Sequence, residues 1–224
     1  AVSEMASSQS SSNLKPNKIQ TAVMSALAAM SLSQTAIAAV DDANVDNPAG
    51  TTITGTAGYG VKLDAGGPYT VANSGEISST DAANEYGIQL LGPTITSLEN
   101  TSTGVIKGVA TGGDSAAGIR LVSSSNINVL NNAGLISGVA DSASGSFGRG
   151  IELSKNSTIG TLTNSGRILG VAADSKGTGL FASESTITTL TNTGTISGSA
   201  VDDDAFGLKL KTASIITLTN NGLI

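Results

Sequence analysis

A serine-bearing loop is the first segment of this sequence whose residues could do chemistry. The segment Gly113-Asp-Ser-Ala-Ala-Gly118 sets Ser115 between an acidic residue and small residues, a setting suited to a nucleophilic serine. A serine hydroxyl becomes a nucleophile only when a neighbouring base, most often a histidine, takes its proton. The chain contains no His, and Asp-Ser recurs at Asp141 and Asp174 in later copies of the same loop. We therefore interpret the segment as a recurring loop and expect no catalytic residue in it.

Acidic residues recur in the stretches that vary most in length, and their carboxylates could bind Ca²⁺. They are Asp81, Asp114, Asp141, Asp174 and the run Asp202–Asp204. Ca²⁺ requires about six to eight oxygen ligands, whereas four of these five stretches offer a single Asp each. Only Asp202–Asp204 concentrates enough charge for weak binding. We expect solvated surface charges here, and we predict no metal site and no cofactor.

A column of side chains raises the possibility of glycan chemistry. It occupies the third position of a repeated Gly-aliphatic-X-Leu box and consists of Lys62, Gln89, Arg120, Glu152, Phe181 and Lys209. A glycosidase needs a pair of carboxylates, and a lyase needs a basic residue beside acids. The residue type instead changes at every copy, which favours a solvated face with a local Arg120–Glu152 pair.

The composition narrows the class of protein further. The chain has 224 residues, of which 12% are charged, with a net charge of −6, 28 Gly and no Cys. Globular domains carry about 25% charged residues. The acidic balance argues against a nucleic-acid or anionic-membrane partner, because both require clustered Lys and Arg. The absence of Cys excludes disulfides and thiolate metal sites.

Six copies of one sequence unit organise most of the chain. Each copy opens with the Gly box, continues thirteen or fourteen residues later with an Asn, and ends on Gly-X-Ile. Successive asparagines are 27, 32, 32, 28 and 28 residues apart. Self-similarity at a period of roughly 20–50 residues is typical of a solenoid. The boxes begin at Gly60, Gly87, Gly118, Gly150, Gly179 and Gly207.

The pattern inside each copy predicts short strands. From Leu190 to Gly198, alternate positions hold Leu, Asn, Gly and Ile, and Thr or Ser stands between them. This period of two predicts strands with one buried face, so we expect an all-β solenoid with three strands per coil and almost no helix. An Ile stands three residues before the Leu of each later copy, as at Ile95 and Leu98. We expect a bend or bulge between the two residues.

The asparagines are the most regular polar residues of the repeat. We predict that they are structural and form a buried ladder in which each side-chain amide bonds to the next coil. The glycine two residues later, such as Gly194 after Asn192, is expected to adopt a positive φ at the corner of the coil. The predicted ladder comprises Asn73, Asn100, Asn132, Asn164, Asn192 and Asn220.

The N-terminal region differs from the repeats. Lys15 and Lys18 precede the apolar run Ile19–Leu32, and Ala36 and Ala38 supply an Ala-X-Ala cleavage pattern. These features predict a helical signal peptide, with an amphipathic or buried helix as the alternative. The run is shorter than the ~20 apolar residues that span a bilayer. We divide the chain into a signal peptide at 1–38, an N-terminal cap or linker at 39–56, and repeats at 57–224 that stop within a copy.

These features together resemble the passenger regions of bacterial autotransporters. The resemblance covers Ala57–Ile224 and rests on the boxes and on lines such as Thr-Leu-Thr-Asn-Thr-Gly-Thr-Ile-Ser-Gly at residues 189–198. It implies a right-handed parallel β-helix of about six coils, preceded by the signal peptide. It also implies export through the periplasm to the surface of a Gram-negative bacterium or to the extracellular space. The implied partner is an outer-membrane β-barrel translocator in a missing C-terminal part.

We expect the exported segment to be a structural or adhesive scaffold that presents variable loops, and not an enzyme. Its expected contacts are host cells, matrix or other copies of itself. One alternative is a β-helical glycan-active enzyme, a lyase or hydrolase whose active site lies outside this segment. A second is a Thr-rich solenoid that binds ice or a crystalline surface. That function would require one regular Thr column, whereas the positions equivalent to Thr191 read Ala72, Asn131, Thr163, Thr191 and Thr219.

Overall fold

The computed structural model describes residues 35–224, apart from 56–57, 82, 113–114 and 142–145. Within these ranges every regular element is a β-strand. The described residues include no helix that is long and apolar enough to cross a membrane. Residues 1–34 of the predicted signal peptide (1–38) lie outside the described residues, and its last four residues form a β-strand.

The strands form three parallel sheets of seven strands each. We name them sheet A, sheet B and sheet C. Sheet A contains β1 (Thr35–Ala38), β4 (Thr51–Gly55), β7 (Glu76–Asp81), β10 (Val105–Ala110), β13 (Leu135–Ala140), β16 (Arg167–Ala172) and β19 (Thr195–Ala200). Sheet B contains β2 (Val40–Asp41), β5 (Tyr59–Leu63), β8 (Glu85–Leu91), β11 (Ala116–Val122), β14 (Gly148–Leu153), β17 (Gly177–Ser183) and β20 (Ala205–Lys211). Sheet C contains β3 (Val45–Asn47), β6 (Tyr69–Asn73), β9 (Thr94–Asn100), β12 (Asn126–Asn132), β15 (Thr158–Asn164), β18 (Thr186–Asn192) and β21 (Ser214–Asn220).

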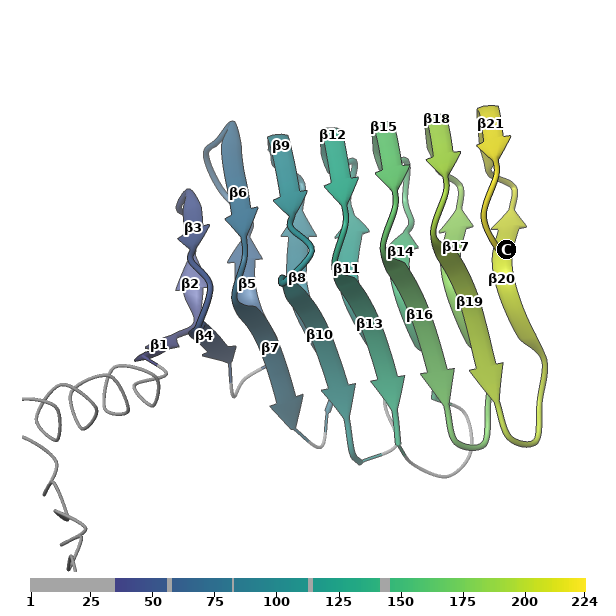
Figure 1. Cartoon of the computed structure of the whole chain (residues 1–224), viewed down its shortest axis with the longest axis horizontal. Coiled ribbons are helices and arrows are strands. Elements are labelled where there is room, and N and C mark those ends of the chain that lie inside the picture. The colour runs from purple at the N-terminus through teal and green to yellow at the C-terminus, as the bar shows by residue number, and fades with distance from the viewer. Residues whose placement is uncertain (1–34, 56–57, 82, 113–114, 142–145) are drawn as a thin grey trace, which may run out of the picture. The chain divides into compact units, whose positions relative to one another are not determined.

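The chain winds through the three sheets in a fixed order. Each coil takes one strand from sheet B, one from sheet C and one from sheet A, and then steps to the next rung (Figure 1). Six three-strand coils run from β2–β4 to β17–β19, and β20 and β21 begin a seventh. The all-β solenoid of about six parallel coils predicted from the repeat is therefore confirmed.

The core is a set of aliphatic columns shared between coils. Ile77, Ile106, Ile136, Ile168 and Ile196 are register partners in sheet A, and all five side chains are fully buried. Sheets B and C contribute equivalent columns of Ile and Leu. One coil could not bury its own apolar face, so each is stabilised by the coils on either side.

The strands of sheet C carry the predicted irregularity. Ile95 and Leu98 are both fully buried, and Thr96 between them is exposed. The register of β9 with β12 passes from Ile95 to Ser97 without pairing Thr96. Two residues therefore point outward in succession, which turns both aliphatic side chains into the core.

The expected conformation of the corner glycines is wrong. The described glycines with positive φ are Gly50, Gly58, Gly66, Gly67 and Gly92, and no glycine two residues after a ladder asparagine is among them. Close stacking requires these corner glycines instead. A Cβ on Gly194 would lie only 2.1 Å from the carbonyl oxygen of Gly166, the equivalent glycine one coil earlier.

The region expected to be a cap or linker forms a regular coil. Strands β2, β3 and β4 lie in register with the next coil, and Asn47 pairs with Asn73. Strand β1 pairs with β4, so that Ala36 lies opposite Thr52 and Ala38 opposite Thr54. Cleavage after Ala38 would therefore remove β1 from sheet A.

Candidate functional site

The predicted asparagines lie in one hydrogen-bonded column at the end of the sheet C strands. Each side-chain amide donates from Nδ2 to Oδ1 of the asparagine on the next coil, at 2.7–2.8 Å. The structure brings all six predicted residues together and adds Asn47 at the start. In the sequence, Asn47 with Gly50 and Ile53 forms a degenerate opening copy of the Asn-Gly-Ile line, which was predicted to be an N-terminal cap and not a member of the ladder. The asparagine ladder is Asn47, Asn73, Asn100, Asn132, Asn164, Asn192 and Asn220.

The ladder leaves its inner members no free group for a ligand. The amide of Asn132 accepts from Asn100 at 2.8 Å and donates to Asn164 at 2.7 Å and to the Arg167 carbonyl at 3.2 Å. Its exposed fraction is 2%. Buried polar groups must be paired to avoid a desolvation cost, so the geometry assigns these residues a structural role.

A second buried polar group is the carboxyl of Glu85 on β8. It is fully buried and accepts a hydrogen bond from the Ser79 hydroxyl, while its Oε1 has no hydrogen-bond partner. Burial raises the pKa of Glu85, and the Ser79 hydrogen bond opposes that rise. Its register partner on β11 is Ala116, and the following rung places Gly148 there. The carboxyl therefore has no acidic register partner on these two rungs for general acid–base chemistry.

The acidic turns join sheet A to sheet B. Asp81, Asp141, Asp174 and Asp202–Asp204 are exposed, and Asp114 lies outside the described residues. Asp203 and Asp204 each place Oδ2 3.9 Å from Lys176 Nζ. The described part of the chain holds no group of three or more potential metal ligands. Ser115 lies in one of these turns, where its backbone N–H donates to Asn84 Oδ1 at 3.2 Å.

The outward column of sheet B is more organised than its sequence indicated. Glu152 lies 2.9 Å from Arg149 Nη1 through Oε1 and 3.8 Å from Arg120 Nε through Oε2. The predicted Arg120–Glu152 pair is therefore part of a three-residue cluster. Arg149 also lies against two aromatic rings, those of Phe147 and Phe181. The sequence did not predict a role for Arg149, because Arg149 stands three residues before Glu152 and outside that column.

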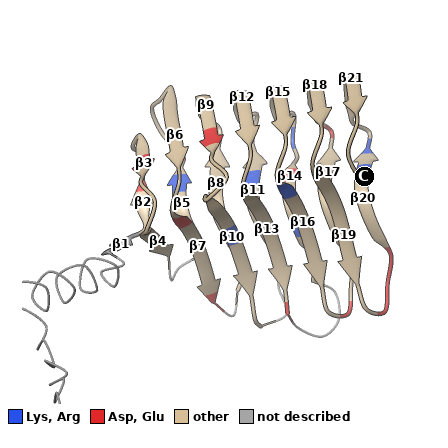
Figure 2. Ribbon diagram, in the orientation of Figure 1, with Lys and Arg blue, Asp and Glu red and all other residues tan. Residues whose placement is uncertain are grey.

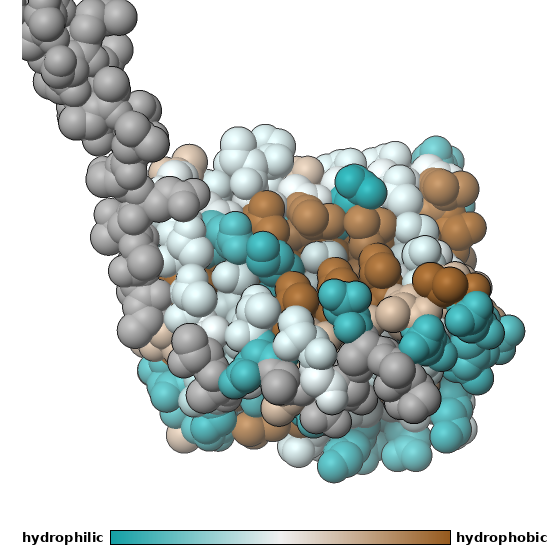
Figure 3. Space-filling model, turned by 90° about the horizontal axis from the view of Figure 1, so that it is seen from below, coloured by the Kyte–Doolittle hydropathy of each residue, from teal (hydrophilic) through white to brown (hydrophobic). Residues whose placement is uncertain are grey.

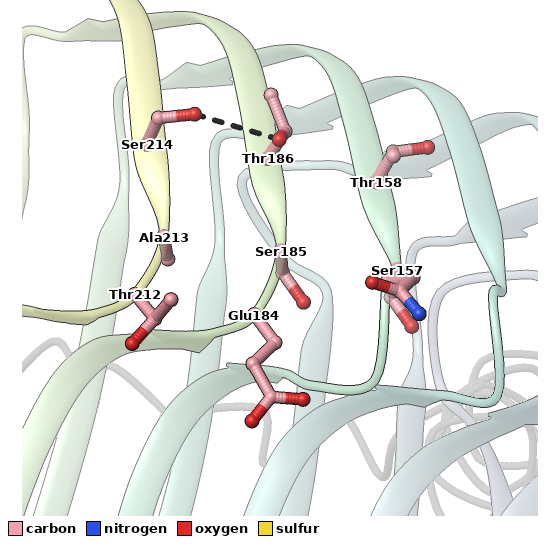
Figure 4. A pocket seen from close by; sticks show the side chains of 9 residues that line it. Ser157, Thr158, Glu184, Ser185, Thr186, Thr212, Ala213 and Ser214 are labelled. Carbon is pink, nitrogen blue, oxygen red and sulfur yellow. Dashed lines mark hydrogen bonds between the residues drawn. The ribbon is translucent and has the colours of Figure 1, made fainter.

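A shallow groove of about 610 Å³ follows the turns between sheets B and C (Figure 4). Its lining is rich in hydroxyl groups, and Thr158, Thr186 and Ser214 occupy one register column. Thr186 and Ser214 are hydrogen bonded at 3.4 Å, and Glu184 supplies a carboxylate. The groove can hydrogen-bond a polar ligand. It brings one carboxylate and no His, Cys or Lys to its wall.

Sheet A presents aliphatic side chains on its outer face. The patch spans β10, β13 and β16 and is half-buried: Val105, Val109, Leu135, Val139, Leu169 and Val171. Figure 3 shows brown, apolar surface gathered in a band, with polar surface around it. Charged residues flank the patch, including Lys107, which lies 3.0 Å from Glu76, and the exposed Arg167. The patch offers a packing surface and no reactive group.

Comparisons with protein-family models, curated proteins and solved structures give no match to this chain. Its class is therefore defined by its own fold: a three-sided β-solenoid with a buried asparagine ladder and three exposed sheet faces. The candidate binding surfaces are the faces and the turns of that solenoid.

Proposed function

We propose that this chain is an exported passenger segment of an autotransporter, with a structural and adhesive role at the surface of a Gram-negative bacterium. In this proposal, residues 1–38 direct export and a β-barrel translocator carries the solenoid across the outer membrane. The solenoid takes the right hand expected of parallel crossover connections. Its faces and turns contact host cells, matrix or other copies of the chain.

The observation that carries the proposal is the stack of parallel strands that continues through the three sheets from β1 to β21, with one register shift between β6 and β9. The same ladder of asparagines continues through the stack. The connections from sheet A to sheet B differ in length, from the single residue 39 to the seven residues 141–147. A scaffold of this kind can change its turns without changing its core, as binding scaffolds do.

Export can be tested by fusing the full chain to an alkaline phosphatase without a signal of its own. That enzyme requires disulfides, which form in the periplasm and not in the cytosol. We expect phosphatase activity from the unaltered fusion and none from Leu27→Arg, which places a charge in the apolar run. Ser10→Arg adds the same charge before the run and should keep activity. An inactive unaltered fusion, or full activity of Leu27→Arg, would contradict the proposal.

Adhesion can be tested with beads coated with the purified full chain. We expect the beads to bind epithelial cells or extracellular matrix, and beads coated with heat-unfolded chain to bind neither. Turnover of a glycan by the purified chain, lost on substitution of one Asp or Glu, would instead establish the enzyme alternative.

A further inference from the structure

The aromatic residues of this chain are concentrated on one face. The sequence contains three Tyr and three Phe. Five of the six belong to the strands of sheet B or to the residue before β14 and lie outside the buried aliphatic cluster, although Tyr86 is itself buried: Tyr59, Tyr86, Phe147, Phe181 and Phe206. The remaining one, Tyr69 of β6, belongs to the core. We call the outward side of sheet B, with these five rings, the sheet B face.

A cation lies over every one of these rings. The Arg120 guanidinium is 4.7 Å from the Tyr86 ring centre, and Lys209 Nζ is 4.0 Å from that of Phe206. Arg149 lies 4.7 Å from the ring of Phe147 and 4.2 Å from that of Phe181. Such contacts are favourable and restrict the motion of long cationic side chains. The guanidinium groups of the sheet B face are therefore held in place before any ligand arrives.

The sheet B face carries more positive than negative side chains, although the chain as a whole is acidic. Its strands carry Lys62, Arg120, Arg149, Lys209 and Lys211 against the outward carboxylates of Asp41 and Glu152, although the whole chain has a net charge of −6. Figure 2 shows blue bands on β5, β11 and β20, and red at the end of β7 and in the turn that follows β19. An anionic ligand is therefore repelled by the acidic turns and attracted to the sheet B face.

We propose that the sheet B face binds an acidic polysaccharide, a chain of pyranose rings that carry carboxylates. The proposal deepens the adhesive function proposed above and rests on it. Guanidinium groups bind carboxylates in a planar, charge-assisted geometry, and the apolar faces of sugar rings stack on Phe and Tyr. The strands repeat at ~4.8 Å along the axis, so an extended polymer meets a cation or a ring at successive rungs. Arg120, Arg149 and Lys209 bind carboxylates, and Phe181 supports a sugar ring.

The test measures binding of the full chain to polygalacturonate, with neutral dextran as the reference polymer. The variant Arg120→Gln/Lys209→Gln removes two charges from the sheet B face, and Gln already stands in that column at Gln89. We expect at least about a tenfold loss of affinity, because charge-assisted hydrogen bonds are lost. The matched control, Lys107→Gln/Arg167→Gln, removes the same charge from sheet A and should change affinity by less than about twofold.

A second variant tests the role of the rings. Phe181→Ala leaves the charge unchanged and should weaken polygalacturonate binding, whereas Leu169→Ala on the outer face of sheet A should not. Circular dichroism and urea unfolding of each variant establish that it folds. Failure of the unaltered chain to bind polygalacturonate at low salt would overturn the proposal, as would equal losses in the sheet A and sheet B double variants.

Two further outcomes separate this proposal from its rivals. The chain could instead bind anionic lipid vesicles as tightly as polygalacturonate, with no effect of Phe181→Ala. This result would show that charge alone explains binding to the sheet B face, and it would overturn the proposal. If coated beads adhere to cells equally with and without Arg120→Gln/Lys209→Gln, the glycan proposal fails and the adhesive function stands. If unaltered beads do not adhere and the chain does not bind polygalacturonate, both fail.

Discussion

Substitution of one asparagine of the ladder should cost far more stability than substitution of the residue that precedes it in the sequence. Asn132→Ala removes the acceptor of one N–H of the Asn100 amide, whose other N–H still bonds the Leu135 carbonyl, and it removes the donor to Oδ1 of Asn164. Asn100 is 1% exposed and Asn164 is 0% exposed, so water does not replace the lost partner. Each unsatisfied buried group costs about 1–3 kcal/mol, which gives about 2–6 kcal/mol for the pair.

The adjacent residue provides a matched control. Asn131 lies on the same strand but points outward and is exposed, so Asn131→Ala should change stability by no more than about 0.5 kcal/mol. The assay is urea unfolding of the full chain followed by circular dichroism. At slopes of about 1–3 kcal/mol per molar urea, Asn132→Ala should lower the midpoint by about 1 M or more. Equal midpoints for the two variants would refute the structural role of the ladder.

Two other substitutions test separate parts of the account. Gly134→Ala should destabilise the fold by about 3 kcal/mol or more. The added Cβ would lie 2.2 Å from the Gly104 carbonyl oxygen, and the stacked backbone cannot move away. A urea midpoint equal to that of the unaltered chain would contradict the close-stacking argument. Glu85→Gln should raise stability at neutral pH and make no difference in acid. Burial raises the pKa of Glu85 above its ordinary value of 4.5, so the stability contributed by its protonated form is complete below pH 4.5 and is lost as pH rises through the higher folded-state pKa. Urea midpoints of both proteins between pH 4 and pH 8 measure this difference, and parallel pH profiles would count against a buried, proton-binding Glu85.

The sequence predicted those features that repeat at the same position in every copy. Alternation and period placed Ile136 and Asn132 in columns because each coil of a solenoid contacts only its neighbours in fixed register. Tyr86 and Arg120 were not predicted to meet, since they stand at different positions of their copies and only the fold brings ring and cation together. The sequence analysis explained the corner glycines by a positive φ. The structure shows a different reason: the backbones of successive coils lie too close together to leave room for a Cβ.

Register between neighbouring coils is the central claim, since the core, the ladder and the sheet B face all depend on it. Thr163 and Thr191 are register partners on β15 and β18, whereas Thr189 is partnered with Thr161. The chain has no Cys, so the two introduced residues carry the only thiols of a double-cysteine variant. Disulfides require Cα atoms about 4.4–6.8 Å apart, a range that includes the ~4.8 Å between parallel rungs.

The deciding measurement is the extent of oxidation of Thr163→Cys/Thr191→Cys and of Thr163→Cys/Thr189→Cys under one mild oxidant, from free-thiol titration of the folded chain. The in-register account predicts rapid disulfide formation in the first variant and little in the second. Equal rates in both, or faster oxidation of the second, would contradict the stacked solenoid.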